Sequence, residues 1–362
     1  MNIDMLVALL FYGLLAIVTG VFAELSIEKK YGQLRVVFSF LTIFIPSLFA
    51  GLRFGIGTDY FSYATTFEVI KLSGDTKIDN SLVFWSINKI VAELGMEFNV
   101  VLFVTSFVTT LFIYLTLRRK KAVLSVGIGM VIYMLLYYQM SFNILRQIAA
   151  MSILLYSIHY INKKAFIKYI LLIFLAMSFH LTAIIFLPLY FLNWLYGTKK
   201  YKKLKIISFI SILILMINFS SILYPIVSRI NSLSYYANSY LYSEREFEFG
   251  LGVFLRALPF ILPGIIFWNE IKKDKDMILY FNILIIGSIT LFSAYGSVNY
   301  TERIAHYFLS ALIIFIPYIY KVSSHLGKLY IGRIILLIIV LLWIWDFIYL
   351  GRNGTVPYNW IF

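Results

Sequence analysis

Several charged and polar side chains lie at the ends of long apolar stretches. Their types and spacing make them candidates for binding or catalysis. Arg146 opens one such stretch together with Asn143 and Gln147. The i, i+3, i+4 spacing puts these three side chains on one face of a helix. Because ionisable groups in apolar segments are costly, they usually serve a site. A polar face led by Arg suits a wet cavity that receives phosphate or carboxylate. The alternative is a snorkelling arginine beside a helix cap at Asn143.

Two further arginines have a similar setting. Arg303 begins another apolar stretch, follows Glu302 and shares a predicted helix face with Tyr307. An interfacial anchor with a Glu–Arg pair is the alternative reading. Arg256 lies about five residues inside a third stretch, hence about 8 Å deep, and two prolines that follow would open the helix there. For this residue too, snorkelling is the alternative.

The segment Gly51-Leu-Arg-Phe-Gly-Ile-Gly-Thr-Asp-Tyr60 leaves an apolar stretch and combines glycines with charge. Its three glycines let backbone N–H groups approach an anion closely. Arg53 adds positive charge and Asp59 offers a carboxylate base. Tyr60 is predicted to bind the ligand together with Arg53. No Lys-Ser or Lys-Thr pair follows the last glycine, which excludes a Walker A loop. An ordinary Gly-rich exit turn is the alternative.

A histidine lies at the midpoint of the apolar stretch 166–196, which is too long for one span and short for two. We predict a tight helical hairpin there with His180 at its tip. Each limb of about 14 residues would reach about 21 Å, against a hydrocarbon core of about 30 Å. His180 would then lie at the floor of an outer vestibule, where it could donate to phosphate or shuttle a proton. A hydrogen-bonded structural histidine is the alternative.

Composition defines the elements that position these residues. Of the 362 residues, 61% are hydrophobic and 13% are charged, against about 25% charged in soluble domains. We therefore predict an all-α fold and one integral membrane domain over residues 1–362. The net charge of +14 comes largely from short Lys clusters between apolar spans, which is typical of membrane topology and excludes nucleic acid as a partner. Cys is absent and the four His lack metal-site spacing, so we expect no metal and no cofactor.

About twelve transmembrane helices are predicted, at about 20 apolar residues per crossing. The hairpin supplies two, and the other ten predicted spans are 3–23, 34–51, 98–117, 122–139, 143–161, 205–224, 251–269, 277–295, 303–320 and 330–350. Six Lys/Arg clusters fall on alternate connections, which places them in the cytoplasm and both termini outside. The long connections 52–97 and 225–250 are then external, and 81–94 is amphipathic, as for a helix in the outer interface.

The basic residues differ in type between the two sides. The cytoplasmic clusters hold 17 Lys among 21 basic residues, whereas seven of the other ten are Arg. Lysine is sufficient as a topology charge, but arginine is preferred where a planar group must bind phosphate or carboxylate. The external face is therefore expected to receive an anionic ligand.

Five segments in this order resemble the EpsG family of Wzy-like polysaccharide polymerases. They are GLRFGIGTDYFSY (51–63), SFNILRQIAA (141–150), FLAMSFHLTA (174–183), YTERIAHYF (300–308) and VPYNWIF (356–362). The resemblance covers nearly the whole chain in order and spacing. It implies a GT-C-like bundle that polymerises polyprenyl-diphosphate-linked repeat units on the outer leaflet of a bacterial cytoplasmic membrane.

The resemblance also assigns a site. Matched by motif, its residues are Arg53, Asp59, Arg146, His180 and Arg303, and Arg256 is added from its depth alone. The arginines would neutralise the leaving diphosphate without a metal. Asp59 is the expected base for the acceptor hydroxyl, with His180 or Glu302 as alternatives. A flippase and a chain-length regulator are expected as partners.

Three other functions remain open at this point. A ligase that moves finished glycan to another acceptor would use the same arginines. A flippase or transporter would place its charges near the bilayer midplane and often shows repeated halves, whereas these arginines crowd one side. A membrane acyltransferase would need access to a cytosolic donor, and the predicted inner face is short and rich in Lys.

Overall fold

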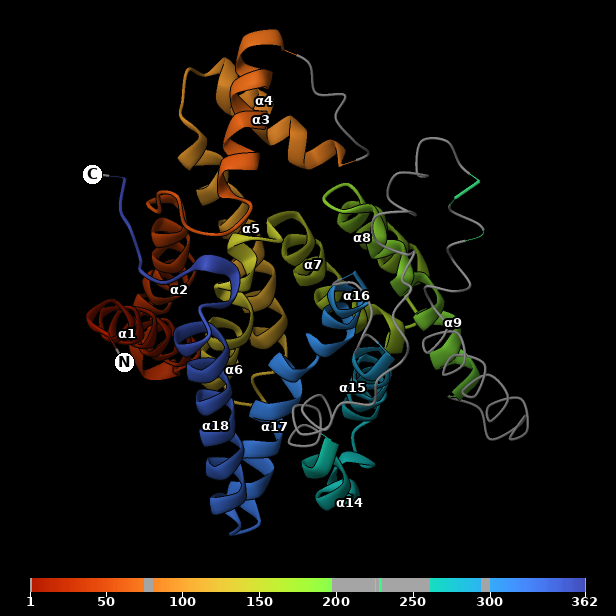
Figure 1. Cartoon of the computed structure of the whole chain (residues 1–362). Coiled ribbons are helices and arrows are strands. Elements are labelled where there is room, and N and C mark those ends of the chain that lie inside the picture. Colours follow the sequence, from red (N-terminus) through yellow and green to blue (C-terminus); the bar gives the residue numbers. More distant parts are fainter. Residues whose placement is uncertain are drawn as a thin grey trace. The chain divides into compact units, whose positions relative to one another are not determined.

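The computed structural model describes residues 2–74, 81–196, 225, 228–229, 261–293 and 300–361. All regular elements in those ranges are helices, which confirms the predicted all-α class (Figure 1). The chain divides into two compact units. Unit 1 comprises residues 1–160, 165–186 and 316–362, and unit 2 comprises residues 161–164 and 187–315. One membrane domain over the whole chain stays a prediction.

Four helices of the described residues are long and apolar enough to cross a membrane. They are α1 (Ile3–Leu25), α2 (Leu34–Gly51), α5 (Phe98–Arg119) and α18 with its π-helical continuation η6 (together Leu329–Tyr349). These helices match four of the predicted spans and indicate a membrane protein. A bent pair, Glu302–Leu309 with Leu312–His325, raises the number to five if it counts as one span. About twelve crossings are therefore not confirmed within the described ranges.

The other described helices are shorter or less apolar. The α-helices are α3 (Tyr60–Ser73), α4 (Leu82–Glu93), α6 (Val126–Tyr133), α7 (Leu145–Asn162), α8 (Phe166–Met177), α9 (Leu187–Tyr196), α14 (Trp268–Ile271), α15 (Lys275–Ser293), α16 (Tyr300–Leu309) and α17 (Leu312–His325). A π-helix, η2 (Met134–Tyr138), continues α6, and the 3-10 helices include η3 (Met140–Phe142) and η4 (Leu181–Phe186).

Several predicted boundaries change. The segment 303–320 is not one straight helix, because α16 and α17 meet at an angle of 42°. The predicted span 205–224 and most of 251–269 lie outside the described residues. Within the connection 52–97, α4 confirms the helix predicted at 81–94, and α3 is an additional helix that was not predicted.

The chain reverses within the stretch 166–196 as predicted, but two membrane crossings there are not confirmed. Helix α8 ends at Met177, a turn follows, and η4 packs back against α8. The hydroxyl of Tyr169 on α8 donates a hydrogen bond to the backbone carbonyl of Phe186, at the end of η4. This buried bond joins the two limbs below the tip that carries His180.

Close helix packing holds the first half of unit 1 together. At the crossing of α1 and α6, a Cβ atom on Gly20 would lie 3.0 Å from the carbonyl oxygen of Gly127. A Cβ on Gly127 would lie 2.6 Å from the carbonyl oxygen of Gly20, closer than real Cβ atoms approach. Both positions therefore need glycine, since any side chain would push the two backbones apart.

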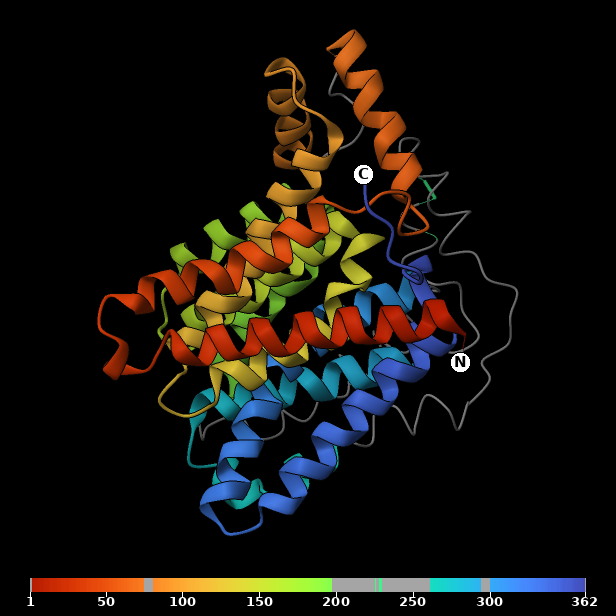
Figure 2. The ribbon, with the colours of Figure 1, turned by 90° about the vertical axis from the view of Figure 1, so that its left-hand side faces the viewer.

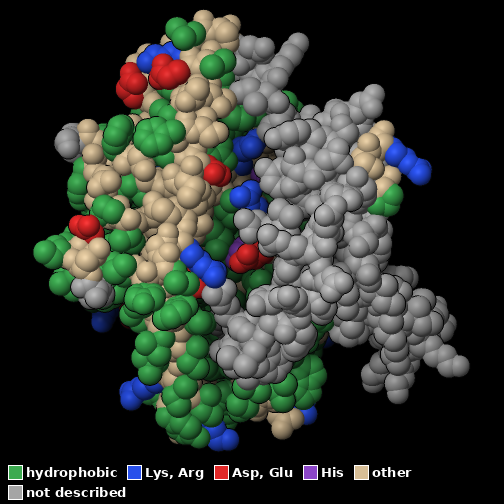
Figure 3. Space-filling model, in the orientation of Figure 1, with side chains coloured by type: hydrophobic (Ala, Val, Ile, Leu, Met, Phe, Trp, Pro, Cys, Tyr) green, Lys and Arg blue, Asp and Glu red, His purple; other side chains and the backbone are tan. Residues whose placement is uncertain are grey.

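Apolar side chains also cover much of the surface of unit 1. Along α18 and η6, Tyr330, Ile334, Leu337, Leu341 and Trp345 recur every three or four residues and are each more than half exposed. Figure 3 shows this hydrophobic surface, with Lys and Arg side chains at its lower end. A stripe of this kind is typical of a face turned towards lipid.

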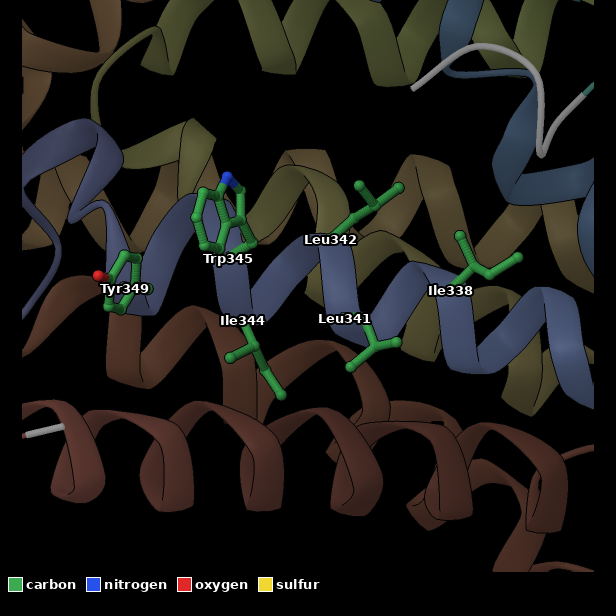
Figure 4. Close-up of a pocket in the computed structure, with 6 residues that line it drawn as sticks. All are labelled: Ile338, Leu341, Leu342, Ile344, Trp345 and Tyr349. Carbon is green, nitrogen blue, oxygen red and sulfur yellow. The ribbon is translucent and has the colours of Figure 1, made fainter. Parts of the chain in front are cut away.

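A shallow apolar groove of about 450 Å³ runs along the same helix. Its lining, drawn in Figure 4, consists of Ile338, Leu341, Leu342, Ile344, Trp345 and Tyr349. The groove belongs to the apolar face described above and has no charged lining residue.

The end of α1, the start of α6 and α17 lie together at one end of unit 1. There, Glu24 of α1 accepts hydrogen bonds from Ser125 Oγ (2.9 Å) and from the backbone N–H of Gly127 (2.6 Å). Lys321 of α17 donates to the carbonyl of Ala122 (2.9 Å). The connections that follow α1, α5 and α17 therefore meet, and each carries a predicted cytoplasmic cluster. This end is called the basic end below.

The opposite end of unit 1 holds those segments of this unit that were singled out for chemistry. The Gly-rich segment follows α2, α7 begins there, and the C-terminal tail crosses there (Figure 2). Which end faces the cytoplasm stays a prediction.

Candidate functional site

Arg146 lies in the first turn of α7 and contacts helices α3 and α4. Its Nη1 donates to Ser81 Oγ over 3.1 Å. Its guanidinium carbon lies 5.2 Å from the ring centroid of Trp85, 5.7 Å from that of Phe84 and 5.9 Å from that of Tyr63. Rings at these distances stabilise the cation through their quadrupoles. Arg146 is thus a half-buried cation whose plane is held by an aromatic wall.

The aromatic wall is itself a packed element. Phe84 is fully buried and packs edge-on against Tyr63 and Trp85, at 5.7 and 4.8 Å between centroids. Ser81 is the residue before α4, so its hydroxyl is fixed where the helix begins. Helices α3 and α4 therefore set the position of the Arg146 guanidinium.

The start of α4 also contacts the hairpin tip. The backbone N–H of Val83 donates to the carbonyl of Ser178 over 3.0 Å. Two residues further on, His180 is half-buried and its Nδ1 lies 2.7 Å from Thr182 Oγ1. Residues 81–83 thus bind the Arg146 side chain on one side and the tip that carries His180 on the other. Both predicted site residues belong to the same end of unit 1.

Arg53 has a different environment. Its side chain is 1% exposed, and Nη1 donates to the carbonyl of Ala50 over 2.8 Å. The guanidinium carbon lies 4.2 Å from the ring centroid of Phe142, and Nε has no hydrogen-bond partner within the described residues. Burial lowers the pKa of Arg53 to about 10, with nearby tyrosines acting in the opposite direction, so the side chain stays charged at neutral pH. The described part of the chain has no carboxylate within ion-pair distance of it.

The C-terminal tail, residues 351–361, encloses Arg53. Two backbone hydrogen bonds flank it, from Phe54 N–H to the carbonyl of Asn359 (3.0 Å) and from Ile361 N–H to that of Leu52 (3.1 Å). Arg53 pairs with Trp360 in an antiparallel bridge between them. The binding role predicted for Arg53 is untested, but its guanidinium faces protein groups.

Thr355 anchors the tail to two helices. Its carbonyl accepts from the Tyr12 hydroxyl (2.9 Å) on α1, and its side-chain oxygen accepts from Gln139 Nε2 (2.8 Å) after η2. The other side of the Gln139 amide accepts from Trp343 Nε1 on α18 (2.6 Å). Thr355 is fully buried, so these bonds replace water for every group involved.

Asn143 and Gln147 are both buried. Asn143 precedes α7 rather than lying within it, and its Nδ2 donates to Asn353 Oδ1 of the tail over 2.9 Å. Gly57, with φ of +99°, approaches so closely that a Cβ there would lie 2.8 Å from Asn143 Oδ1. Glycine is needed at this point for both space and backbone conformation. The Gly-rich segment therefore packs on Asn143 and the tail.

Asp59 and Tyr60 end the Gly-rich segment. Asp59 is half-buried, precedes α3 and accepts from Thr58 Oγ1 over 3.3 Å. Tyr60 is 5% exposed and packs edge-on against Phe54, Phe61 and Phe98. Asp59 thus keeps a partly accessible carboxylate, whereas the Tyr60 ring is part of the packing.

The remaining predicted residues concern unit 2. On α16, Glu302 and Arg303 are half-buried and Tyr307 is fully buried. Helix α16 packs on α15, where a Cβ on Gly287 would lie 2.9 Å from Phe308 Cβ. Arg256, which was also predicted as a site residue, lies outside the described residues.

A family model covers residues 36–360 of the chain, from within α2 to the tail, and it is the model of the EpsG family. The chain belongs to the EpsG family. EpsG proteins are Wzy-like polysaccharide polymerases or glycosyltransferase-like proteins. Comparisons with curated proteins and with solved structures give no match.

Sequence reasoning missed several residues of this EpsG chain that position the predicted ones. They are Tyr63, Ser81, Phe84 and Trp85 at Arg146, and Asn353, Thr355 and Trp360 at the Gly-rich segment. The amphipathic pattern of 81–94 and the aromatic tail motif were visible signals. Neither pattern indicates its partner helix, because these contacts join residues far apart in the sequence.

Proposed function

We propose that this EpsG-family protein is an outer-leaflet glycosyltransferase that polymerises polyprenyl-diphosphate-linked oligosaccharide repeat units into a bacterial surface polysaccharide. Its site faces the periplasmic or extracellular side of the cytoplasmic membrane. The family match over residues 36–360 supports polymer synthesis. The main structural support for the site is the position of Arg146, whose side chain is half-buried and contacts α3 and α4.

The proposed reaction joins two lipid-linked glycans. A hydroxyl oxygen of the acceptor sugar attacks the anomeric carbon of the donor glycan. The bond between that carbon and the phosphate oxygen breaks, the hydroxyl proton passes to a base, and polyprenyl diphosphate leaves as an anion. Arg146 stabilises the charge that develops on the diphosphate, which is the largest demand that this reaction makes on a site. The step needs no metal, because guanidinium groups supply the positive charge.

Asp59 is the base in this proposal. It is a half-buried carboxylate at the same end of unit 1 as Arg146, and residues 81–83 connect that region to His180. The His180 imidazole can accept and release a proton and is the alternative base. The proposal also includes Glu302, Arg303 and Tyr307. They are included because of their sequence motif and not because of their position in the structure. A glycan ligase would use the same groups with another acceptor, and a lipid-linked sugar transporter remains the second alternative.

Reconstitution with a lipid-linked repeat unit tests the proposal. Purified protein in liposomes should convert the repeat unit to a ladder of longer glycans and release polyprenyl diphosphate. One transfer to a different acceptor identifies a ligase, and movement of the unit across the bilayer without bond formation identifies a transporter. The exposed Arg333 of α18 provides a matched control, since Arg333→Gln should leave the ladder unchanged. Full activity in both Arg146→Lys and Arg303→Lys would overturn the diphosphate role.

A further inference from the structure

A second arginine of unit 1 is fixed by aromatic residues, at the basic end. Arg119, in the last turn of α5, stacks on Tyr156 of α7 with its guanidinium carbon 3.8 Å from the ring centroid. Its Nη2 donates to the hydroxyl of Tyr156 and, over 3.0 Å, to that of Tyr160. The two tyrosines are one helical turn apart and thus hold both the plane and one edge of the guanidinium.

The rest of this guanidinium is available to a ligand. Arg119 is exposed, and within the described residues its Nε and Nη1 have no hydrogen-bond partner. Lys168 of α8 lies 6.0 Å from the Tyr160 ring centroid and adds a second positive charge. Neither cation has a carboxylate within ion-pair distance in the described ranges. Two neighbouring uncompensated cations, one of them pre-oriented, favour a phosphate group.

The surface beside these cations is apolar. At the start of α8, Phe166, Ile167 and Leu171 are 41%, 74% and 62% exposed. Arg119 ends a helix long and apolar enough to cross the bilayer, so its guanidinium lies at headgroup depth. A ligand here meets positive charge at one end and hydrocarbon at the other. Free phosphate would use only the first of these features.

We propose that Arg119, Tyr156, Tyr160 and Lys168 form a binding site for the phosphate headgroup of an anionic phospholipid. The lipid belongs to the leaflet that meets the basic end. The phosphate oxygens accept from Arg119 Nε and Nη1 and pair with the Lys168 ammonium, while an acyl chain lies on the exposed face of α8. This site is distinct from the one proposed at the opposite end and does not depend on the enzymatic proposal.

Native mass spectrometry of the full chain tests the site. The detergent-purified protein is titrated with phosphatidylglycerol, and separately with phosphatidylcholine, which has the same phosphate but no net charge. We expect phosphatidylglycerol to bind in preference, with about tenfold weaker affinity in Arg119→Gln, since a charge-assisted pair is lost. Arg333→Gln, which removes an exposed arginine without a tyrosine platform, should bind like the wild type. Equal binding of both lipids would overturn the proposal.

Further measurements distinguish a lipid phosphate from a free phosphate, and a loss of binding from a loss of folding. Excess inorganic phosphate should displace little phosphatidylglycerol, because it lacks the acyl contacts, and full displacement would show a free-anion site instead. Tyr156→Phe keeps the ring but removes a hydroxyl, so it should weaken binding by less than Arg119→Gln. If Arg119→Gln does not remain monodisperse, Lys168→Gln at the surface of α8 replaces it. Unchanged affinity in Lys168→Gln would contradict the proposed headgroup contact.

Discussion

Arg53 and Arg146 look alike in the sequence but have different environments in the structure. Both are arginines beside apolar stretches on the predicted outer side, and both were assigned to one anionic ligand. Arg53 is 1% exposed and bonded to backbone carbonyls, whereas Arg146 is half-buried against an aromatic wall. A buried cation without an acidic partner organises its surroundings, and a partly accessible one can meet a ligand. Residue type and predicted membrane side therefore do not separate these two environments, but burial does.

The largest expected effect is on turnover at Arg146. Arg146→Gln should lower the polymerisation rate by about 100- to 1,000-fold, the usual cost of removing one group that stabilises transition-state charge. Initial rates in liposomes with a lipid-linked repeat unit measure this. The unfolding temperature should stay close to that of the wild type, because Arg146 is only half-buried. A large drop in unfolding temperature with normal turnover per folded molecule would show that Arg146 has a structural role like that expected for Arg53.

Arg53→Gln should show the reverse pattern. Loss of the guanidinium leaves buried carbonyls without donors, so we expect a loss of about 2–4 kcal/mol in the free energy of unfolding. Chemical unfolding in detergent measures it. Turnover per folded molecule should stay within about threefold of the wild type, since small changes in loop position have modest effects compared with loss of a reacting contact. Normal stability with abolished turnover would make Arg53 a direct ligand after all.

The aromatic wall should have an intermediate effect on turnover. Trp85→Leu removes the nearest of the three rings at Arg146 and should lower the rate about threefold to tenfold, in line with the strength of a cation–π contact. Trp85→Phe should restore much of the rate because it keeps a ring. Rates are normalised to folded protein, since Trp85 is also buried. Equal rates for the Leu and Phe variants would show that the wall is only packing.

The smallest expected effect is at the tail. Thr355→Val removes the acceptor of the Gln139 amide and should lower the free energy of unfolding by about 1–2 kcal/mol. Thr66→Val is the control, because that hydroxyl is exposed and bonds only within its own helix. Thermal unfolding of both variants gives the comparison. A cost at Thr355 no larger than at Thr66 would show that the tail contributes little to the Arg53 environment.

The sequence predicted the local features of this fold and missed the distant ones. Apolar length predicted α1, α2, α5 and α18, and the short limbs of 166–196 predicted the reversal near His180, because each of these depends on neighbouring residues. The burial of Arg53 depends on Trp360 and Asn359, about 300 residues away. No periodicity within 51–60 could indicate that cover.

The same limitation applies to the candidate site. The stripe of Asn143, Arg146 and Gln147 was predicted from helical spacing, yet Asn143 precedes the helix and bonds to the tail. The wall around Arg146 comes from α3 and α4, and only α4 had been predicted. Candidate site residues could thus be predicted from residue type and spacing. The residues that position them could be identified only from the tertiary structure.

The tail has a consequence for how the protein is made. Tyr358 bonds to the carbonyl of Phe49 across 309 positions of the chain. At about 5–20 residues per second, translation separates the appearance of these two residues by roughly 15–60 s. Throughout that interval α2 is already made while the arginine that follows it lacks its cover. The side chain of Arg53 can therefore reach its buried environment only after residues 353–361 have been made.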